Sequence, residues 1–170
     1  IGSGALLSNT TASDNVAVGV NSLVLNTTGT INTAVGSFAL DANTTGSYNT
    51  ALGKDALTSC STGNSNTAIG SRTLQAMTTS GRKCALGEAS LYRVTTGNSN
   101  AGIGTESGTF ITTGSFNTCV GTFAGDTITT GNDNILIGEN CDVDSGSAAS
   151  RFGIGIDLSV GENNRIMIGY

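Results

Sequence analysis

The chain has 170 residues, of which 25 are Gly; it contains no Pro, His or Trp, and only 11% of its residues are charged, against about 25% in ordinary globular domains. Mean hydropathy is +0.07 and net charge only −5, which disfavours a disordered chain, because disorder combines low hydrophobicity with high net charge. Seven basic residues are too few for a nucleic-acid footprint, and no apolar run reaches the roughly 18 residues of a membrane span, so we expect neither partner for this segment.

A repeat of 17 residues begins at Ile1-Gly2 and is marked by an apolar residue followed by Gly. After 14 residues instead of 17, a last pair follows at Ile168-Gly169. We expect 1–170 to be one repeat region, cut from a longer fibre, with divergent C-terminal coils over 139–170. The glycines that we assign to turns are Gly19, Gly36, Gly53, Gly70, Gly87, Gly104, Gly121, Gly138 and Gly155.

Each repeat is too short for a pair of helices, and segments such as NTAVG alternate polar, small and β-branched residues as a short strand does. The sequence therefore predicts an all-β fold, a parallel β-solenoid (β-roll) of about ten 17-residue coils. The apolar residue before each Gly is expected to form the core column, which comprises Val18, Val35, Leu52, Ile69, Leu86, Ile103, Val120, Ile137 and Ile154.

One sizeable apolar residue per strand leaves a single chain under-filled, because little apolar area offsets the cost of ordering each residue. We therefore expect a homotrimer, either intertwined or side by side. Three rods can share an apolar axis that none could bury alone.

Four residues before the Gly, an Asn recurs, interrupted by Lys83 and Arg151. Identical Asn residues at equivalent positions of stacked coils can hydrogen-bond from rung to rung. We predict a structural ladder of Asn15, Asn32, Asn49, Asn66, Asn100, Asn117 and Asn134.

Two further columns change along the chain in opposite directions. One is Leu from Leu6 to Leu91 and then becomes Gly108, whereas the other begins with Asn9 and ends with Ile128. We infer that apolar volume moves from one part of the cross-section to another.

The repeats NTAVGSFAL (32–40), NTALGKDAL (49–57) and NTAIGSRTL (66–74) resemble the left-handed parallel β-roll repeats of trimeric autotransporter adhesin heads. The NTTG insert more closely resembles repeat regions of bacteriophage tail fibres and related viral fibres. The second resemblance implies a structural and adhesive fibre segment of a virion, a shaft or head that displays or makes contacts with a host-cell surface glycan or protein. The first implies the alternative, the head of a bacterial surface adhesin.

Nothing in the sequence indicates catalysis or a cofactor. Without His, a Ser or Cys nucleophile lacks its commonest base, so we predict a protein that is not an enzyme. Asp142 and Asp144, with Glu139 and Asp157 nearby in register, form the one acidic cluster. We interpret it as a solvated loop, with carboxylate catalysis and calcium binding as alternatives; the Gly and Glu positions of an EF-hand loop are not occupied.

Three other features invite interpretation. Cys60, Cys84, Cys119 and Cys141 fall in different columns, which favours free, mostly buried thiols over disulfides or zinc.

Recurrent Thr-Thr pairs raise an ice-binding solenoid as a second alternative, although adjacent residues of an extended chain face opposite sides and leave one outward file. If the rod binds glycans, the ring-bearing candidates for surface binding are Phe38, Tyr48, Phe116 and Phe123.

Overall fold

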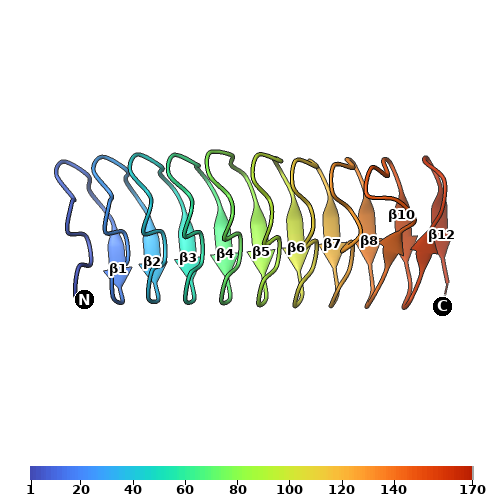
Figure 1. Cartoon of the computed structure of the whole chain (residues 1–170), viewed down its shortest axis with the longest axis horizontal. Helices are drawn as coiled ribbons and strands as arrows, with labels where there is room; N and C mark the ends of the chain where they lie inside the picture. Colours follow the sequence, from blue (N-terminus) through green and yellow to red (C-terminus); the bar gives the residue numbers. More distant parts are fainter. Residues whose placement is uncertain (170) are drawn as a thin grey trace.

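The computed structural model describes residues 1–169 as a parallel β-solenoid, which confirms the predicted fold class (Figure 1). Ten strands form one sheet in the order β1 to β8, β10, β12, and β9 pairs with β11 in a second, two-stranded sheet. No helix occurs in residues 1–169. The strands are β1 (Val16–Val18), β2 (Thr33–Val35), β3 (Thr50–Leu52), β4 (Thr67–Ile69), β5 (Cys84–Leu86), β6 (Ala101–Ile103), β7 (Thr118–Val120), β8 (Ile135–Ile137), β9 (Asp142–Val143), β10 (Phe152–Ile154), β11 (Ser159–Val160) and β12 (Ile166–Ile168).

Neighbouring coils stack in register. Each strand of β1 to β8 pairs with the next so that a residue lies opposite the one 17 positions later, as Ala34 lies opposite Ala51. The last step is shorter, because Phe152 of β10 pairs with Ile166 of β12. At the usual spacing of about 4.8 Å between strands, the ten strands make a rod roughly 45 Å long.

The core of the rod is built from four columns of inward-facing side chains. The first is the middle residue of each strand, such as Ala34, Ala51 and Ala68, all fully buried. A second column of small residues, which includes Ala39, Ala56 and Ala124, lies three positions after the corner glycine. The other two columns supply the larger side chains. Their fully buried members include Leu23, Leu40, Leu57, Leu74 and Leu91 in one column and Met77, Val94, Ile111 and Ile128 in the other.

The predicted core column is wrong for the single chain. Successive strand residues point to opposite faces, and because Ala51 points inward, its neighbour Leu52 points outward and is 45% exposed. Each chain also fills a core of its own, so an under-filled interior is not what a partner would have to cover. The outward-facing residues, exposed or half-buried, are Val18, Val35, Leu52, Ile69, Leu86, Ile103, Val120, Ile137 and Ile154.

Apolar volume does move between columns along the rod. Where the Leu column becomes Gly108, a Cβ at that position would lie 2.8 Å from Leu91 Cδ2 and 3.0 Å from Ile111 Cδ1. At Gly125 a Cβ would lie 2.4 Å from Cys119 Sγ. Larger side chains in the other columns occupy the space that Leu leaves.

The glycines after the strands stack directly on one another. Gly70 has φ +135°, and a Cβ added to it would lie 2.4 Å from the carbonyl oxygen of Gly87 in the next coil. The same left-handed backbone and close approach recur from Gly19 to Gly138. Only Gly combines that φ with the absence of a Cβ, so the corners from Gly19 to Gly138 require it.

The buried Asn column links each coil to its neighbours. Asn49 Nδ2 donates to the carbonyl oxygen of Gly63 (2.8 Å), and Asn49 Oδ1 accepts from the backbone N–H of Asn66 (3.0 Å). Equivalent bonds join Asn32 to Gly46 and to the backbone of Asn49. These amides satisfy turn backbone groups that would otherwise be buried without partners.

Candidate functional site

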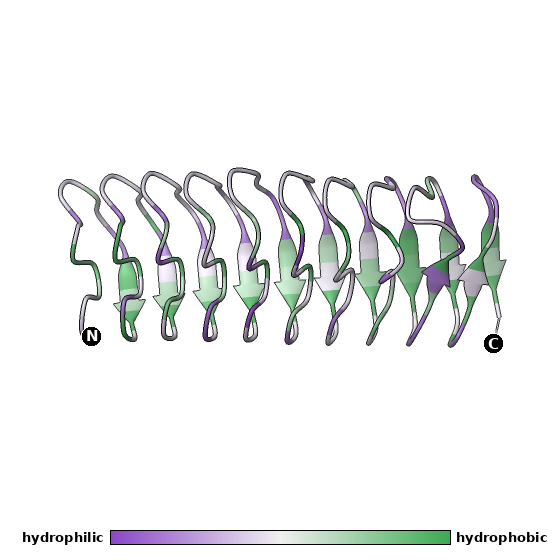
Figure 2. Ribbon diagram, viewed as in Figure 1, coloured by the Kyte–Doolittle hydropathy of each residue, from purple (hydrophilic) through white to green (hydrophobic). Residues whose placement is uncertain are grey.

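An apolar stripe runs along the outer face of the ten-stranded sheet. We define it as the outward-facing third residues of the strands, from Val18 of β1 to Ile154 of β10. Figure 2 shows green, hydrophobic segments in strands along the whole sheet. Contiguous apolar surface of this extent is uncommon on monomeric proteins and marks interaction sites.

Small side chains border the apolar stripe and leave it open. The first residue of each strand also points outward, and between β2 and β7 it is Thr, Cys or Ala. No charged residue occurs in any strand from β1 to β8. A flat, uncharged surface of this kind can pack closely against another sheet.

The four ring-bearing candidates do not come together. Tyr48 and Phe116 share one column, four coils apart, whereas Phe38 and Phe123 share another. Their backbones have φ between +56° and +61°. Tyr48 and Phe116 are the more exposed, at 60% and 59%.

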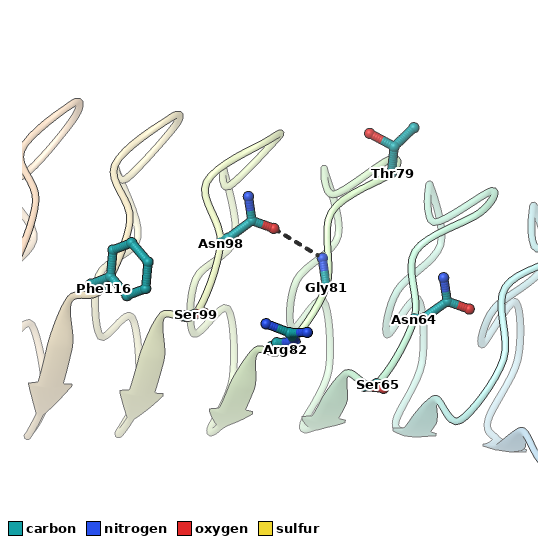
Figure 3. Close-up of a pocket in the computed structure, with 8 residues that line it drawn as sticks. All are labelled: Asn64, Ser65, Thr79, Gly81, Arg82, Asn98, Ser99 and Phe116. Atoms are coloured by element: carbon teal, nitrogen blue, oxygen red, sulfur yellow. Dashed lines mark hydrogen bonds between the residues drawn. The ribbon is translucent and has the colours of Figure 1, made fainter.

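A surface cavity of about 500 Å³ is lined by four consecutive members of the Tyr48 column, Ser65, Arg82, Ser99 and Phe116 (Figure 3). Arg82 lies between two short residues, Ser65 and Ser99, with Phe116 beyond Ser99. Within this column Ser65 and Ser99 are short and flank the longer Arg82, so the cavity lies where two larger side chains are missing. Sequence inspection missed Arg82, although its coil departs from the repeat.

The break in the repeat is visible in the turn that precedes β5. Five other coils carry Thr-Thr-Gly and, three residues later, an Asn, whereas here the Gly is displaced by one position to Gly81 and Lys83 replaces the Asn. Lys83 is 2% exposed, and its ammonium donates to Ser80 Oγ. Its backbone N–H still donates to Asn66 Oδ1 (3.2 Å), but its side chain offers no acceptor to the next coil.

Lys83→Asn is expected to stabilise the chain by about 1–2 kcal/mol at pH 7, because it removes a buried charge and restores a ladder position. Burial lowers the pKa of Lys83 from 10.5 to about 8. Because the unfolded chain binds the Lys83 proton more readily, the natural chain loses stability as the pH falls from 10.5 to about 8. The gain from Lys83→Asn should therefore be largest below pH 8 and smaller at pH 10. Urea unfolding at pH 6.5 and pH 10 measures both; an unchanged or lower stability at pH 6.5 would contradict the assignment.

The acidic cluster does not converge on one point. Asp142 accepts from the backbone N–H of Thr127 (3.0 Å), and burial together with the neighbouring Asp126 carboxyl raises its pKa to about 7. Asp144 forms an ion pair with Arg151. Of the other two, Asp157 accepts from Asn140 Nδ2 (2.8 Å) and Glu139 is exposed. Within residues 1–169 no three acidic or Cys side chains are grouped as metal ligands would be.

The four Cys side chains are free thiols, with Cys84 exposed and the others buried. Burial raises the pKa of Cys60 to about 11 and that of Cys119 to about 12, so neither is a reactive thiolate at neutral pH.

The two side chains of a Thr-Thr pair have different surroundings, as the alternation of an extended chain predicts. The hydroxyl of the first Thr donates to a backbone carbonyl of the next coil, as Thr27 does to Thr44 (3.0 Å). The second Thr is exposed, as at Thr28 and Thr45. The result is one outward file of Thr side chains.

Comparison of the chain with protein-family models, with curated protein sequences and with solved structures finds no match. Among residues 1–169 there is also no helix with the length and apolar character needed to cross a membrane. The stripe, the ring-bearing columns and the cavity are therefore the features on which a function can be argued.

Proposed function

We propose that this chain is a non-enzymatic structural and adhesive fibre segment, the shaft or head of a viral tail fibre that displays or makes contacts with a host surface. Three copies pack side by side, with their apolar stripes facing a common axis. The observation that carries the proposal is an unbroken apolar stripe on a rod whose own core is already filled.

The stripe is the surface that gains most from self-association. Leu52, Leu86 and Ile103 are each about 40% exposed or more, and burying apolar surface contributes roughly 25 cal/mol per Å². Because the stripe repeats once per coil, its contribution grows with the length of the rod. A closed symmetric assembly buries the whole stripe and leaves no apolar face open for further association.

The rest of the coil suits a rigid spacer. Strand pairing, the Asn ladder and the stacked glycines join each coil to the next along the rod. Such a body can hold a binding tip at a distance or present weak contacts repeatedly, and three chains then gain avidity without a strong single site.

Replacing Ile69 and Ile103 together by Asp is expected to give folded monomers. Both side chains lie on the apolar stripe and outside the chain's own core, so two charges on each chain should prevent burial of the stripe without unfolding the coil. Light scattering after gel filtration should give three times 16.9 kDa for the natural chain and 16.9 kDa for the variant, with unchanged circular dichroism.

The matched control is Thr96→Asp with Thr113→Asp, which adds the same charge to the exposed Thr file. This variant should remain trimeric. A natural chain that is monomeric, or a double Ile variant that is still trimeric, would contradict the proposal.

A further inference from the structure

The cavity beside Arg82 exists because one coil departs from the repeat. Gly81 has no side chain where the same position in adjacent coils holds Asn64 and Asn98, and Ser65 and Ser99 are short where Tyr48 and Phe116 are large. A Cβ at Gly81 would lie 2.4 Å from the carbonyl oxygen of Asn64. The hollow is thus formed by missing side chains over a rigid, hydrogen-bonded floor.

Arg82 is the only arginine in residues 1–169 for which the structure shows no partner. Arg72 pairs with Glu88, and Arg93 lies over the ring of Phe110. The other two, Arg151 and Arg165, form ion pairs with acidic side chains. In a chain of net charge −5, an exposed guanidinium without a carboxylate is available to an external anion.

The cavity lining is polar, with one aromatic wall. None of the described residues that line it is acidic. Ser65, Ser99, Thr79, Asn64 and Asn98 line it and offer hydroxyl and amide groups. The amide oxygens already accept from backbone N–H groups, Asn98 from Gly81 (3.3 Å) and Asn64 from Ser47, and these bonds orient the amides before any ligand arrives.

We propose that this cavity binds an acidic saccharide through Arg82, Phe116 and the polar side chains between them. The Arg82 guanidinium forms a bidentate bond with the sugar carboxylate. The apolar face of the pyranose ring packs on the exposed ring of Phe116, and the Ser and Asn groups contact its hydroxyls. Lys83, buried in the same coil, adds positive charge behind the turn.

The size of the cavity, the spacing of Arg82 and Phe116, and the departure of this coil from the repeat are consistent with an acidic saccharide. A volume of about 500 Å³ lies in the usual range of small-molecule sites. Arg82 and Phe116 are two coils apart, about 9–10 Å along the rod, which spans one sugar ring and its carboxylate. The coil also gives up a ladder Asn for a buried Lys83, and local departures of this kind are expected at functional positions.

The inference rests on the proposed function for its setting, since a sugar site on a fibre would face a host surface. The test is independent of assembly, because Arg82 is not part of the apolar stripe. Loss of the trimer and loss of sugar binding are therefore separate results.

The experiment titrates the natural chain, residues 1–170, with sodium glucuronate and with N-acetylneuraminate, while backbone amide NMR signals are recorded. Glucose, sodium acetate and a short poly-glutamate peptide are titrated in parallel. We expect millimolar dissociation constants for both acidic sugars, with shifts centred on Arg82, Ser99 and Phe116, and binding at least about tenfold weaker in glucose and acetate.

Arg82→Ser copies the residue that neighbouring coils carry in this column and should weaken acidic-sugar binding at least about tenfold. Arg93→Ser removes the same charge outside the cavity and should leave binding unchanged; Phe116→Ser should weaken it severalfold. No shifts with either acidic sugar, or equal shifts in Arg82→Ser, would overturn the proposal. Equal binding of acetate or of the acidic peptide would replace the saccharide with a general anion or a protein partner.

Discussion

Gly70→Ala is expected to destabilise the chain by about 2–5 kcal/mol, a large effect for a single methyl group. The left-handed backbone at Gly70 costs a residue with Cβ about 1–2 kcal/mol, and the overpacking adds about 1–3 kcal/mol. The added Cβ would lie 2.4 Å from the carbonyl oxygen of Gly87, a backbone atom that cannot move without shifting the adjacent coil. Urea unfolding followed by circular dichroism measures the change.

Gly161→Ala is the matched control for this prediction. Its nearest neighbour would be Asp144 Oδ2 at 3.6 Å, an ordinary contact, and the stability should change by less than about 0.5 kcal/mol. If Gly70→Ala were tolerated as well as Gly161→Ala, the stacking of coil on coil described at this corner would be wrong.

Asn49→Ala should lower the free energy of unfolding by about 2–4 kcal/mol, although the side chain touches no ligand and carries no charge. The change leaves the backbone N–H of Asn66 buried without its partner, and it leaves the carbonyl oxygen of Gly63 with only the weak donor Cys60 Sγ (3.8 Å). Each group that loses its partner costs about 1–3 kcal/mol. The unfolding free energy in urea should fall by that amount, with a shift to lower melting temperature.

Asn132→Ala is the matched control for Asn49→Ala, because Asn132 lies in the same repeat region but outside the ladder. Asn132 is exposed, and the backbone N–H of Ser115, which donates to Asn132 Oδ1 (2.8 Å), can form a hydrogen bond with water instead. Its loss should cost less than about 1 kcal/mol. Equal effects at Asn49 and Asn132 would show that the ladder contributes nothing beyond surface hydrogen bonding.

The spacing of the glycines and asparagines predicted the coils because both residue types have roles that depend on local geometry. A Gly at the corners and an Asn before seven of the strands indicate a left-handed φ and a buried turn, whichever way the strand faces. The same reasoning failed for the Val18 to Ile154 column. A three-residue strand with large residues outside and Ala inside reverses the usual association of size with burial.

The candidate site was partly visible in the sequence. Phe116 and Tyr48 could be identified as ring-bearing residues outside the expected core columns, but the gap between them depends on what is absent at Ser65, Gly81 and Ser99. Arg82 gains its significance from lacking an acidic neighbour, and that neighbour could have come from any adjacent coil. The register of the coils determines which residues lie near one another, whereas the direction of each side chain determines which charged groups form an ion pair.

By itself the sequence determined that this protein is a stack of parallel coils, because a strict period allows each coil to repeat the hydrogen bonds of the one before it. Only the tertiary structure decided which face of each strand is interior. That choice depends on how the Leu column and the column that ends at Ile128 fill the cross-section. Beside the Leu column the buried strand residue is Ala, and where the Leu column has ended it is larger, as at Cys119 and Leu136. The large strand residues are therefore outside, where they form the stripe on which the proposed assembly depends.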